Sequence, residues 1–171
     1  MEVSSLTSKN YNMYIKDFYS SNRQASQSKK RYAIGSRELV EADSSALKKI
    51  SQSLNNLDYS QDNGSELFYT VKSFVTAYNN LCDSSGNTKQ YEISKAQKFL
   101  KNLTKDQTEA LQEIGITVSS SGKLELDEDE LSSSSPQKLA KIFSSDNDFS
   151  NKISFYANKI LKTACHVDIQ I

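Results

Sequence analysis

The sequence has few of the residues from which catalytic and metal-binding sites are usually built. It contains one histidine (His166), one proline (Pro136), no tryptophan and two cysteines in 171 residues. A single histidine leaves almost no material for imidazole general-base catalysis or for a multi-histidine metal site. The five glycines stand singly, so no glycine-rich loop is present to cradle a phosphate group. We therefore expect neither an enzyme nor a resident cofactor or metal ion.

Long hydrophobic runs and an excess of one charge are also missing. No apolar stretch approaches the roughly 20 residues that a membrane-spanning helix requires, so we expect no membrane span. Lysine and arginine together number 21, as do aspartate and glutamate, which argues against a general affinity for nucleic acid. The charges are nonetheless uneven: residues 1–37 carry seven basic and two acidic side chains, whereas five of the six residues 125–130 are acidic.

Both charged segments have a plain structural interpretation. Lys29, Lys30 and Arg31 are too few to indicate a nucleic-acid site and are interpreted as part of a solvated basic segment. Residues 127–130 are all acidic but lack the spaced ligands and the internal glycine of a calcium-binding loop. Carboxylates in this arrangement are typical of the amino-terminal end of a helix, where the helix dipole is positive.

The chain length suits one domain preceded by a polar segment. Residues 1–35 mix Ser, Asn, Lys and Gln with scattered tyrosines and show little periodicity, so we expect a flexible N-terminal segment. If the folded body buries its apolar stripes within one chain, deleting that segment is expected to leave thermal stability almost unchanged. Residues 36–171 are expected to form the folded body. Cys82 and Cys165 within it are expected to be free and buried, because two cysteines are too few for a disulfide scaffold.

The stretch over residues 71–131 contains both helical and strand periodicity. Apolar residues at its start recur at steps of three and four and predict a helix that packs on another helix: Leu67, Val71, Phe74, Tyr78 and Leu81. Alternating segments on either side of a Ser-Ser-Ser-Gly run then predict a β-hairpin, whose turn requires a positive φ at Gly122. We expect this helix and this hairpin to contact each other.

Further helices are predicted around this centre. Ser36 is a candidate N-cap for a helix to about residue 57, and a turn at Asn63-Gly64 makes an antiparallel helical hairpin with the helix that follows. A third helix has one predicted apolar face: Ile93, Ala96, Phe99, Leu100 and Leu103. Either Asp127 or Asp129 is a candidate start of one later helix, and the Ser135-Pro136 pair is a candidate start of another. The whole pattern predicts a mainly α-helical protein, an elongated antiparallel helical bundle with one small β-hairpin at about residues 115–126.

Two narrow apolar stripes, over residues 40–57 and 149–164, could either close the bundle or recruit another chain. Asp43 interrupts the first stripe at a seam position. If the stripes recruit another chain, the candidate partner-binding residues are those with heptad spacing: Val40, Leu47, Ile50, Leu54, Ile153, Tyr156 and Ile160. The expected partners are proteins, including a second copy of the chain.

Four motifs follow one another in a specific order. They are V-x-x-F-V-x-A-Y-N-x-L (71–81), I-G-I (114–116), G-x-L-x-L-D-E-x-x-L (122–131) and P-x-x-L-x-x-I-F (136–143). In this order and spacing they resemble the C-terminal region of the flagellar filament-capping proteins, the hook-associated protein 2 family. The chain departs from that family in length, leaving no room for the large β-rich middle domains, and its first residues do not match the family's N-terminal helix.

The resemblance implies a non-enzymatic structural protein that assists the assembly or organisation of flagellin subunits. It implies flagellin or the chain itself as partner, and a place at the bacterial flagellum or outside the cell, reached by flagellar export. The alternative interpretation is a cytoplasmic helical binding module, such as an export chaperone or adaptor that holds a helix of its partner.

Overall fold

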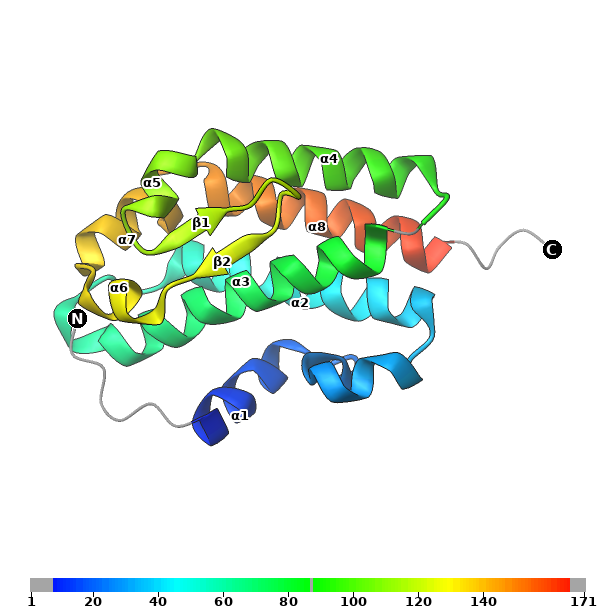
Figure 1. Ribbon diagram of the computed structural model, residues 1–171, viewed down its shortest axis with the longest axis horizontal. Helices are drawn as coiled ribbons and strands as arrows, with labels where there is room; N and C mark the ends of the chain where they lie inside the picture. Colours follow the sequence, from blue (N-terminus) through cyan, green and yellow to red (C-terminus); the bar gives the residue numbers. More distant parts are fainter. Residues whose placement is uncertain (1–7, 87, 167–171) are drawn as a thin grey trace.

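The long helices lie along the long axis of the molecule, each antiparallel to the helices that it packs against (Figure 1). The computed structural model describes residues 8–86 and 88–166, and within them the four helices are α2 (Ser36–Asn56), α3 (Gly64–Gly86), α4 (Tyr91–Asp106) and α8 (Phe149–Cys165). Helix α2 packs against α3 on one side and α8 on the other, and α8 packs in turn against α4. The predicted mainly helical bundle is confirmed, as is the helical hairpin formed by α2 and α3.

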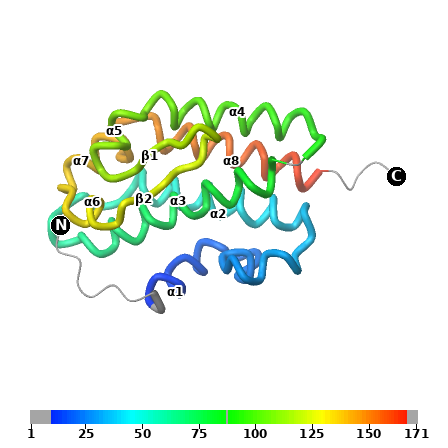
Figure 2. The backbone as a smooth tube through the Cα atoms, in the orientation of Figure 1, coloured from blue at the N-terminus to red at the C-terminus, as the bar shows by residue number. Residues whose placement is uncertain are grey.

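Shorter elements connect these helices, as the path of the chain in Figure 2 shows. The connection between α4 and α8 contains α5 (Thr108–Gln112), β1 (Ile116–Val118), β2 (Leu124–Leu126), α6 (Glu128–Ser133) and α7 (Pro136–Phe143). The short 3-10 helix η3 (Gln61–Asn63) links α2 to α3. Residues 8–35, which we call the N-terminal arm, contain α1 (Ser8–Phe18), η1 (Arg23–Ser26) and η2 (Ser28–Ala33).

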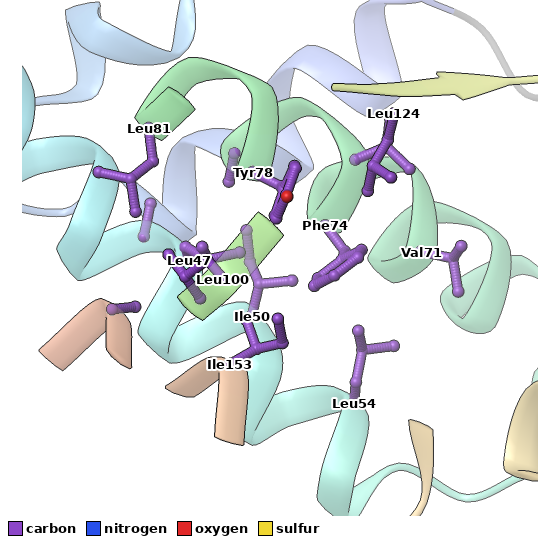
Figure 3. Close-up of a cluster of buried hydrophobic side chains, with 14 of the residues drawn as sticks. Leu47, Ile50, Leu54, Val71, Phe74, Tyr78, Leu81, Leu100, Leu124 and Ile153 are labelled. Carbon is purple, nitrogen blue, oxygen red and sulfur yellow. The ribbon is translucent and has the colours of Figure 1, made fainter. Parts of the chain in front are cut away.

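The core forms where α2, α3, α4 and α8 converge beneath the hairpin (Figure 3). Side chains from every one of these elements are fully or almost fully buried there, among them Leu47, Ile50, Leu54, Phe74, Tyr78, Leu100, Leu124 and Ile153. Phe74 meets Phe143 and Phe149 edge to face, with ring centroids 5.4 and 6.0 Å apart. Each such apolar side chain contributes about 1.5–3 kcal/mol by leaving water, so this region holds the four long helices together.

The predicted hairpin is confirmed. Strands β1 and β2 pair antiparallel with Ile116 opposite Leu126 and Val118 opposite Leu124. Gly122 has a φ of 81°, and its N–H donates to the carbonyl of Ser119 (2.9 Å), which closes the turn. The glycine is required because a residue with a Cβ atom rarely adopts a positive φ.

The hairpin lies against α3, so the expected contact between the helix and the hairpin of residues 71–131 is present. The Asn79 amide accepts from the N–H of Leu124 (2.9 Å) and donates to the carbonyl of Leu124 (2.7 Å). Its side chain therefore pairs with the edge of β2 as a neighbouring strand would. The Tyr78 hydroxyl donates to the carbonyl of Gly122 (3.1 Å) and lies 3.0 Å from the Thr104 hydroxyl, which joins α3, the turn and α4. Burial raises the pKa of Tyr78.

Local capping signals are confirmed at two of the three predicted helix starts. The Asp127 carboxylate accepts from the N–H groups of Asp129 and Glu130, and the Ser135 hydroxyl accepts from the N–H of Lys138. The predicted Ser36 cap is wrong, because Gly35 occupies the cap position and Ser36 is already helical. The Gly35 carbonyl accepts the first helical hydrogen bond, from the N–H of Leu39 (2.9 Å).

The N-terminal arm differs from the flexible segment predicted for residues 1–35. Residues 8–35 contain one α-helix and two 3-10 helices and pack against α2 and α3, while residues 1–7 lie outside the described part of the chain. Ile15, Tyr19 and Ala25 are buried. The hydroxyls of Tyr11 and Tyr14 lie 2.8 and 2.7 Å from those of Thr76 and Thr70 on α3. Tyr11, Tyr14 and Tyr19 therefore belong to the docking face of the arm, whereas Tyr32 is exposed.

A buried polar cluster fixes this arm to the body. Asp43, which interrupts the apolar stripe of α2, is fully buried and accepts two hydrogen bonds from the Arg31 guanidinium (2.8 and 2.7 Å). The Tyr19 hydroxyl donates to the same carboxylate (3.1 Å) and accepts from the Asn80 amide (2.9 Å). Arg31 is thus part of an internal ion pair, and the interpretation of residues 29–31 as a solvated basic segment is wrong at this residue.

The two cysteines are free, as predicted, but only one is buried. Cys82 lies in the interior at the end of α3, whereas Cys165 is exposed in the last turn of α8. Burial raises the pKa of the Cys82 thiol to about 11. Among the described residues, no helix is both long enough and apolar enough to span a membrane.

Candidate protein-interaction surface

The apolar stripes of α2 and α8 pack on each other within one chain. Six of the seven candidate partner-binding residues are buried: Val40, Leu47, Ile50, Leu54, Ile153 and Ile160. A partner reaches most of these side chains only if the interface between α2 and α8 opens, although Val40, at 5% exposed, also lines an open hollow. Tyr156, the seventh, is partly buried and lies at the outer edge of the contact between α8 and α4. Of the predicted residues, Tyr156 is therefore the most exposed.

Three aromatic side chains gather at this edge. The rings of Phe99 and Tyr156 are stacked, with centroids 5.0 Å apart and planes 11° apart, and Phe155 meets Tyr156 edge to face at 5.2 Å. Phe155 is 63% exposed and Phe99 is 41% exposed. We call Phe99, Phe155 and Tyr156 the aromatic cluster. Large apolar side chains grouped in solvent are typical of surfaces that bind other proteins.

The helix geometry of α4 explains why Phe99 faces outward. Ile93, Ala96 and Leu100 are buried and define the inner face of the helix. Phe99 was predicted to belong to that face. It lies at the edge of the face and stacks on the partly buried Tyr156 of α8. Phe99 therefore lies at the exposed border of the predicted apolar face, where it is 41% exposed. Periodicity alone did not distinguish the exposed Phe99 from the buried Leu100, because the two residues are adjacent in a helix with 3.6 residues per turn.

The aromatic cluster extends along α4 into an open hollow of about 530 Å³. It is lined by Tyr91, Ser94, Lys95, Lys98, Phe99 and Asn102. Tyr91 is 71% exposed, and the Lys95 ammonium lies 5.8 Å from the centroid of its ring. The hollow therefore offers apolar ring surface and cationic groups side by side.

Two lysines lie beside the aromatic cluster, because Lys95 and Lys98 line the hollow together with Phe99. Helix α4 carries four lysines and two acidic residues, and α8 carries three lysines and no acidic residue. Not all of them belong to this surface: the Lys101 ammonium donates to the carbonyl of Ser121 on the hairpin turn. The salt bridge between Lys159 and Glu92 (3.4 Å) joins the two helices. The hollow beside Phe99 is therefore bordered by cationic groups, although the whole chain has no net charge.

A second hollow of about 550 Å³ lies where η2, the end of α3 and the starts of α2 and α4 meet. Its charged lining residues are Arg31, Arg37 and Asp83, and each of them already takes part in an ion pair, with Asp43, Glu41 and Lys123 respectively. The hollow therefore lacks a titratable pair arranged for acid–base chemistry.

The residues considered for chemistry lie apart. His166 is exposed at the end of α8, and within residues 8–86 and 88–166 no three His, Cys, Asp or Glu side chains are grouped so as to hold a metal ion. In the acidic segment 125–130, Asp127 caps α6 and Glu128 forms an ion pair with Lys72 (2.6 Å). Both of these acidic side chains are therefore engaged in contacts within the fold.

Comparisons with known proteins add no family to this description. No protein-family model matches the sequence, and no match was found among curated proteins or among solved structures. The resemblance to the filament-capping proteins therefore stays a prediction carried by the four motifs alone.

Proposed function

We propose that this protein is a non-catalytic structural protein that works by binding another protein through the aromatic cluster on α4 and α8. The observation that carries the proposal is the contrast between the closed core and this surface. The α2 and α8 stripes are buried against each other, whereas Phe155 and Phe99 remain exposed together. Burying a fully exposed phenylalanine contributes about 1.5–3 kcal/mol, and covering the exposed 63% of Phe155 and 41% of Phe99 would contribute a corresponding part of that for each ring.

The filament-cap resemblance gives this role a specific form: a protein at the bacterial flagellum that helps to organise flagellin, with flagellin or a second copy of the chain as partner. In support, the residues of the four motifs form neighbouring parts of one unit. The helix over residues 71–81 holds the hairpin through Asn79 and Tyr78, and the same hairpin leads directly into α6 and α7.

A deletion strain of the source bacterium tests this form of the proposal. Electron microscopy should show short, absent or disordered filaments, and fractionation should find the protein outside the cytoplasm. The wild-type gene should restore the filaments, and a gene carrying Phe99→Ser and Phe155→Ser should not. Normal filaments in the deletion strain, with all of the protein in the cytoplasm, would contradict it.

A cytoplasmic binding module, such as an export chaperone or adaptor, is the second candidate. It is favoured by the closure of the α2 and α8 stripes within one chain, since the bundle then needs no second copy to bury them. Co-purification of the cytoplasmic protein with flagellin or another secreted subunit would favour this module. Secretion of the protein itself through the flagellar route would favour the structural role.

A further inference from the structure

We infer that the outer face of α4 and α8 binds an acidic amphipathic helix. This inference rests on the proposed function, because it names the chemistry of the partner that the aromatic cluster takes. The surface concerned comprises the aromatic cluster, Tyr91 and the lysines beside them, chiefly Lys95 and Lys98.

The spacing of the exposed rings suits a helical partner. Tyr91 and Phe99 are eight residues apart on α4, which places them about 12 Å apart along the helix axis. An amphipathic helix presents apolar side chains at positions i, i+3 or i+4, and i+7, so its anchors recur over a similar distance. Phe155 on α8 provides a third exposed ring beside Phe99 and Tyr156. A helix lying along α4 could therefore contact all three positions with one apolar stripe.

The charge of the surface selects an acidic helix over a basic one. Lys95 and Lys98 line the hollow beside Phe99, and no acidic residue lines it. In the described part of the chain, Lys159 and Lys152 have carboxylate partners, at 3.4 and 3.5 Å, but no ion pair involves Lys95 or Lys98. Glutamates flanking the apolar stripe of a partner would meet these two ammonium groups. Such complementary charges raise the association rate and exclude partners of like charge.

Two other occupants fit less well. The acidic segment 125–130 of a second copy offers charge, but Leu126 is half-buried and Leu131 is fully buried, so it lacks an apolar stripe to cover the rings. A single-stranded nucleic acid would need open ring faces for its bases. Phe99 and Tyr156 already stack on each other, which leaves fewer faces free.

The test uses the full chain and a designed helical peptide labelled with fluorescein, with leucines along one face and glutamates on both flanks. Fluorescence anisotropy should detect binding, and the same peptide with lysines in place of the glutamates should bind about tenfold more weakly or not at all. Phe99→Ser with Phe155→Ser should weaken binding of the acidic peptide by about tenfold or more, as expected for the loss of central anchors. Lys95→Glu with Lys98→Glu, at exposed positions that should not affect folding, should do the same. Tyr32→Ser removes an even more exposed aromatic side chain outside this surface and should leave binding unchanged.

Several results would overturn the inference. Equal binding of the lysine peptide would show that the partner is not acidic, yet protein binding at the aromatic cluster would stand. A dimer seen by light scattering and abolished by Phe155→Ser, without binding of either peptide, would identify a second copy as the occupant and again spare the proposed function. Displacement of the acidic peptide by oligothymidylate, or its unchanged binding to the double phenylalanine variant with melting curves equal to wild type, would overturn both the inference and the proposed function.

Discussion

Arg31 and Asp43 form a bidentate ion pair between the N-terminal arm and the centre of α2. Two nitrogens of the guanidinium donate to the two carboxylate oxygens at 2.8 and 2.7 Å, and the carboxylate is fully buried. Tyr19 supplies a third hydrogen bond from the same arm. Burying a carboxylate costs free energy unless the group is paired and hydrogen-bonded. The body of the protein therefore depends on the arm for the partners of Asp43.

Removing Arg31 should strongly destabilise the fold. Arg31→Met leaves the Asp43 carboxylate buried without its cation and should lower the free energy of unfolding by about 3–5 kcal/mol. Urea unfolding monitored by circular dichroism measures the change. Lys152→Met provides the matched control, because it breaks an exposed pair with Asp148 and should cost at most about 0.5 kcal/mol. A similar loss in the two variants would refute the structural role of the buried pair.

Deleting residues 1–35 should lower the melting temperature markedly, contrary to the expectation from the sequence. The deletion exposes the surfaces on α2 and α3 that Ile15 and Tyr19 cover, and it leaves Asp43 unpaired. Adding Asp43→Leu to the deletion should recover part of the loss, because it replaces an unpaired charge by an apolar side chain. Thermal melts of the three proteins test this, and an unchanged melting temperature on deletion would show that the arm does not stabilise the body.

These two predictions lie where the sequence was hardest to interpret. Local signals identified the hairpin, the positive φ of Gly122 and the caps at Asp127 and Ser135, because each depends on residues a few positions apart. Asp43 appeared only as an interruption, because its partners come from the arm and not from neighbouring residues.

The candidate surface was predicted in part for the same reason. Heptad spacing located the stripes of α2 and α8 but could not show that they pack on each other, since either stripe would suit a second chain equally well. Heptad spacing identified Tyr156. Phe155, however, belongs to no stripe, and Phe99 was assigned to the same apolar face as buried residues of α4. The signal that could have located Phe99 and Phe155 is a phenylalanine that lies beside an apolar stripe on a helix rich in lysine.

The protein should lose stability in alkaline solution. Burial raises the pKa of Tyr19 well above its ordinary value of 10, and the Asp43 carboxylate raises it further; burial also raises the pKa of Tyr78. Each folded phenol holds its proton where the unfolded one loses it, so the stabilisation is complete below about pH 10 and declines as the pH rises through the folded pKa.

The expected decline is about 1.4 kcal/mol per pH unit for each such tyrosine above about pH 10. Urea midpoints measured from neutral pH to about pH 11 test it. Tyr19→Phe should reduce the slope by about the contribution of one tyrosine, at a cost near 1 kcal/mol at neutral pH for the lost hydrogen bonds. A free energy of unfolding that stays constant across this range would be inconsistent with buried phenols.

Two glycines with nearly equal φ should differ in their tolerance of alanine. Gly115 and Gly122 have φ values of 82° and 81°, so either substitution costs about 1–2 kcal/mol in backbone strain. A Cβ atom at Gly122 would come 2.9 Å from Cδ of Lys101, a flexible side chain that can move. At Gly115 it would come 2.8 Å from the backbone oxygen of Asp127, which cannot move without displacing the start of α6. Gly115→Ala should therefore be clearly the less stable in urea unfolding, and equal stability would argue against this packing.

The two thiols should react at very different rates. Cys165 is exposed, whereas Cys82 is buried with a pKa of about 11, so little thiolate is available at Cys82 near pH 8. A disulfide reagent that releases a coloured thiol should modify one cysteine at once and the second only after unfolding. Cys165→Ser should abolish the fast phase, and Cys82→Ser should leave it intact. Rapid modification of both thiols in the folded protein would be incompatible with a buried Cys82.

The packing of α2 against α8 has a consequence for biosynthesis. Ribosomes produce α2 long before α8, with α3, α4 and the hairpin synthesised in between. During that interval, Leu47 and Ile50 lack the helix that completes their burial. A nascent chain stalled before Phe149 would expose this apolar surface of α2 to chaperones or to other incomplete chains. We therefore expect chaperones and proteases to act most strongly on truncated chains that lack α8.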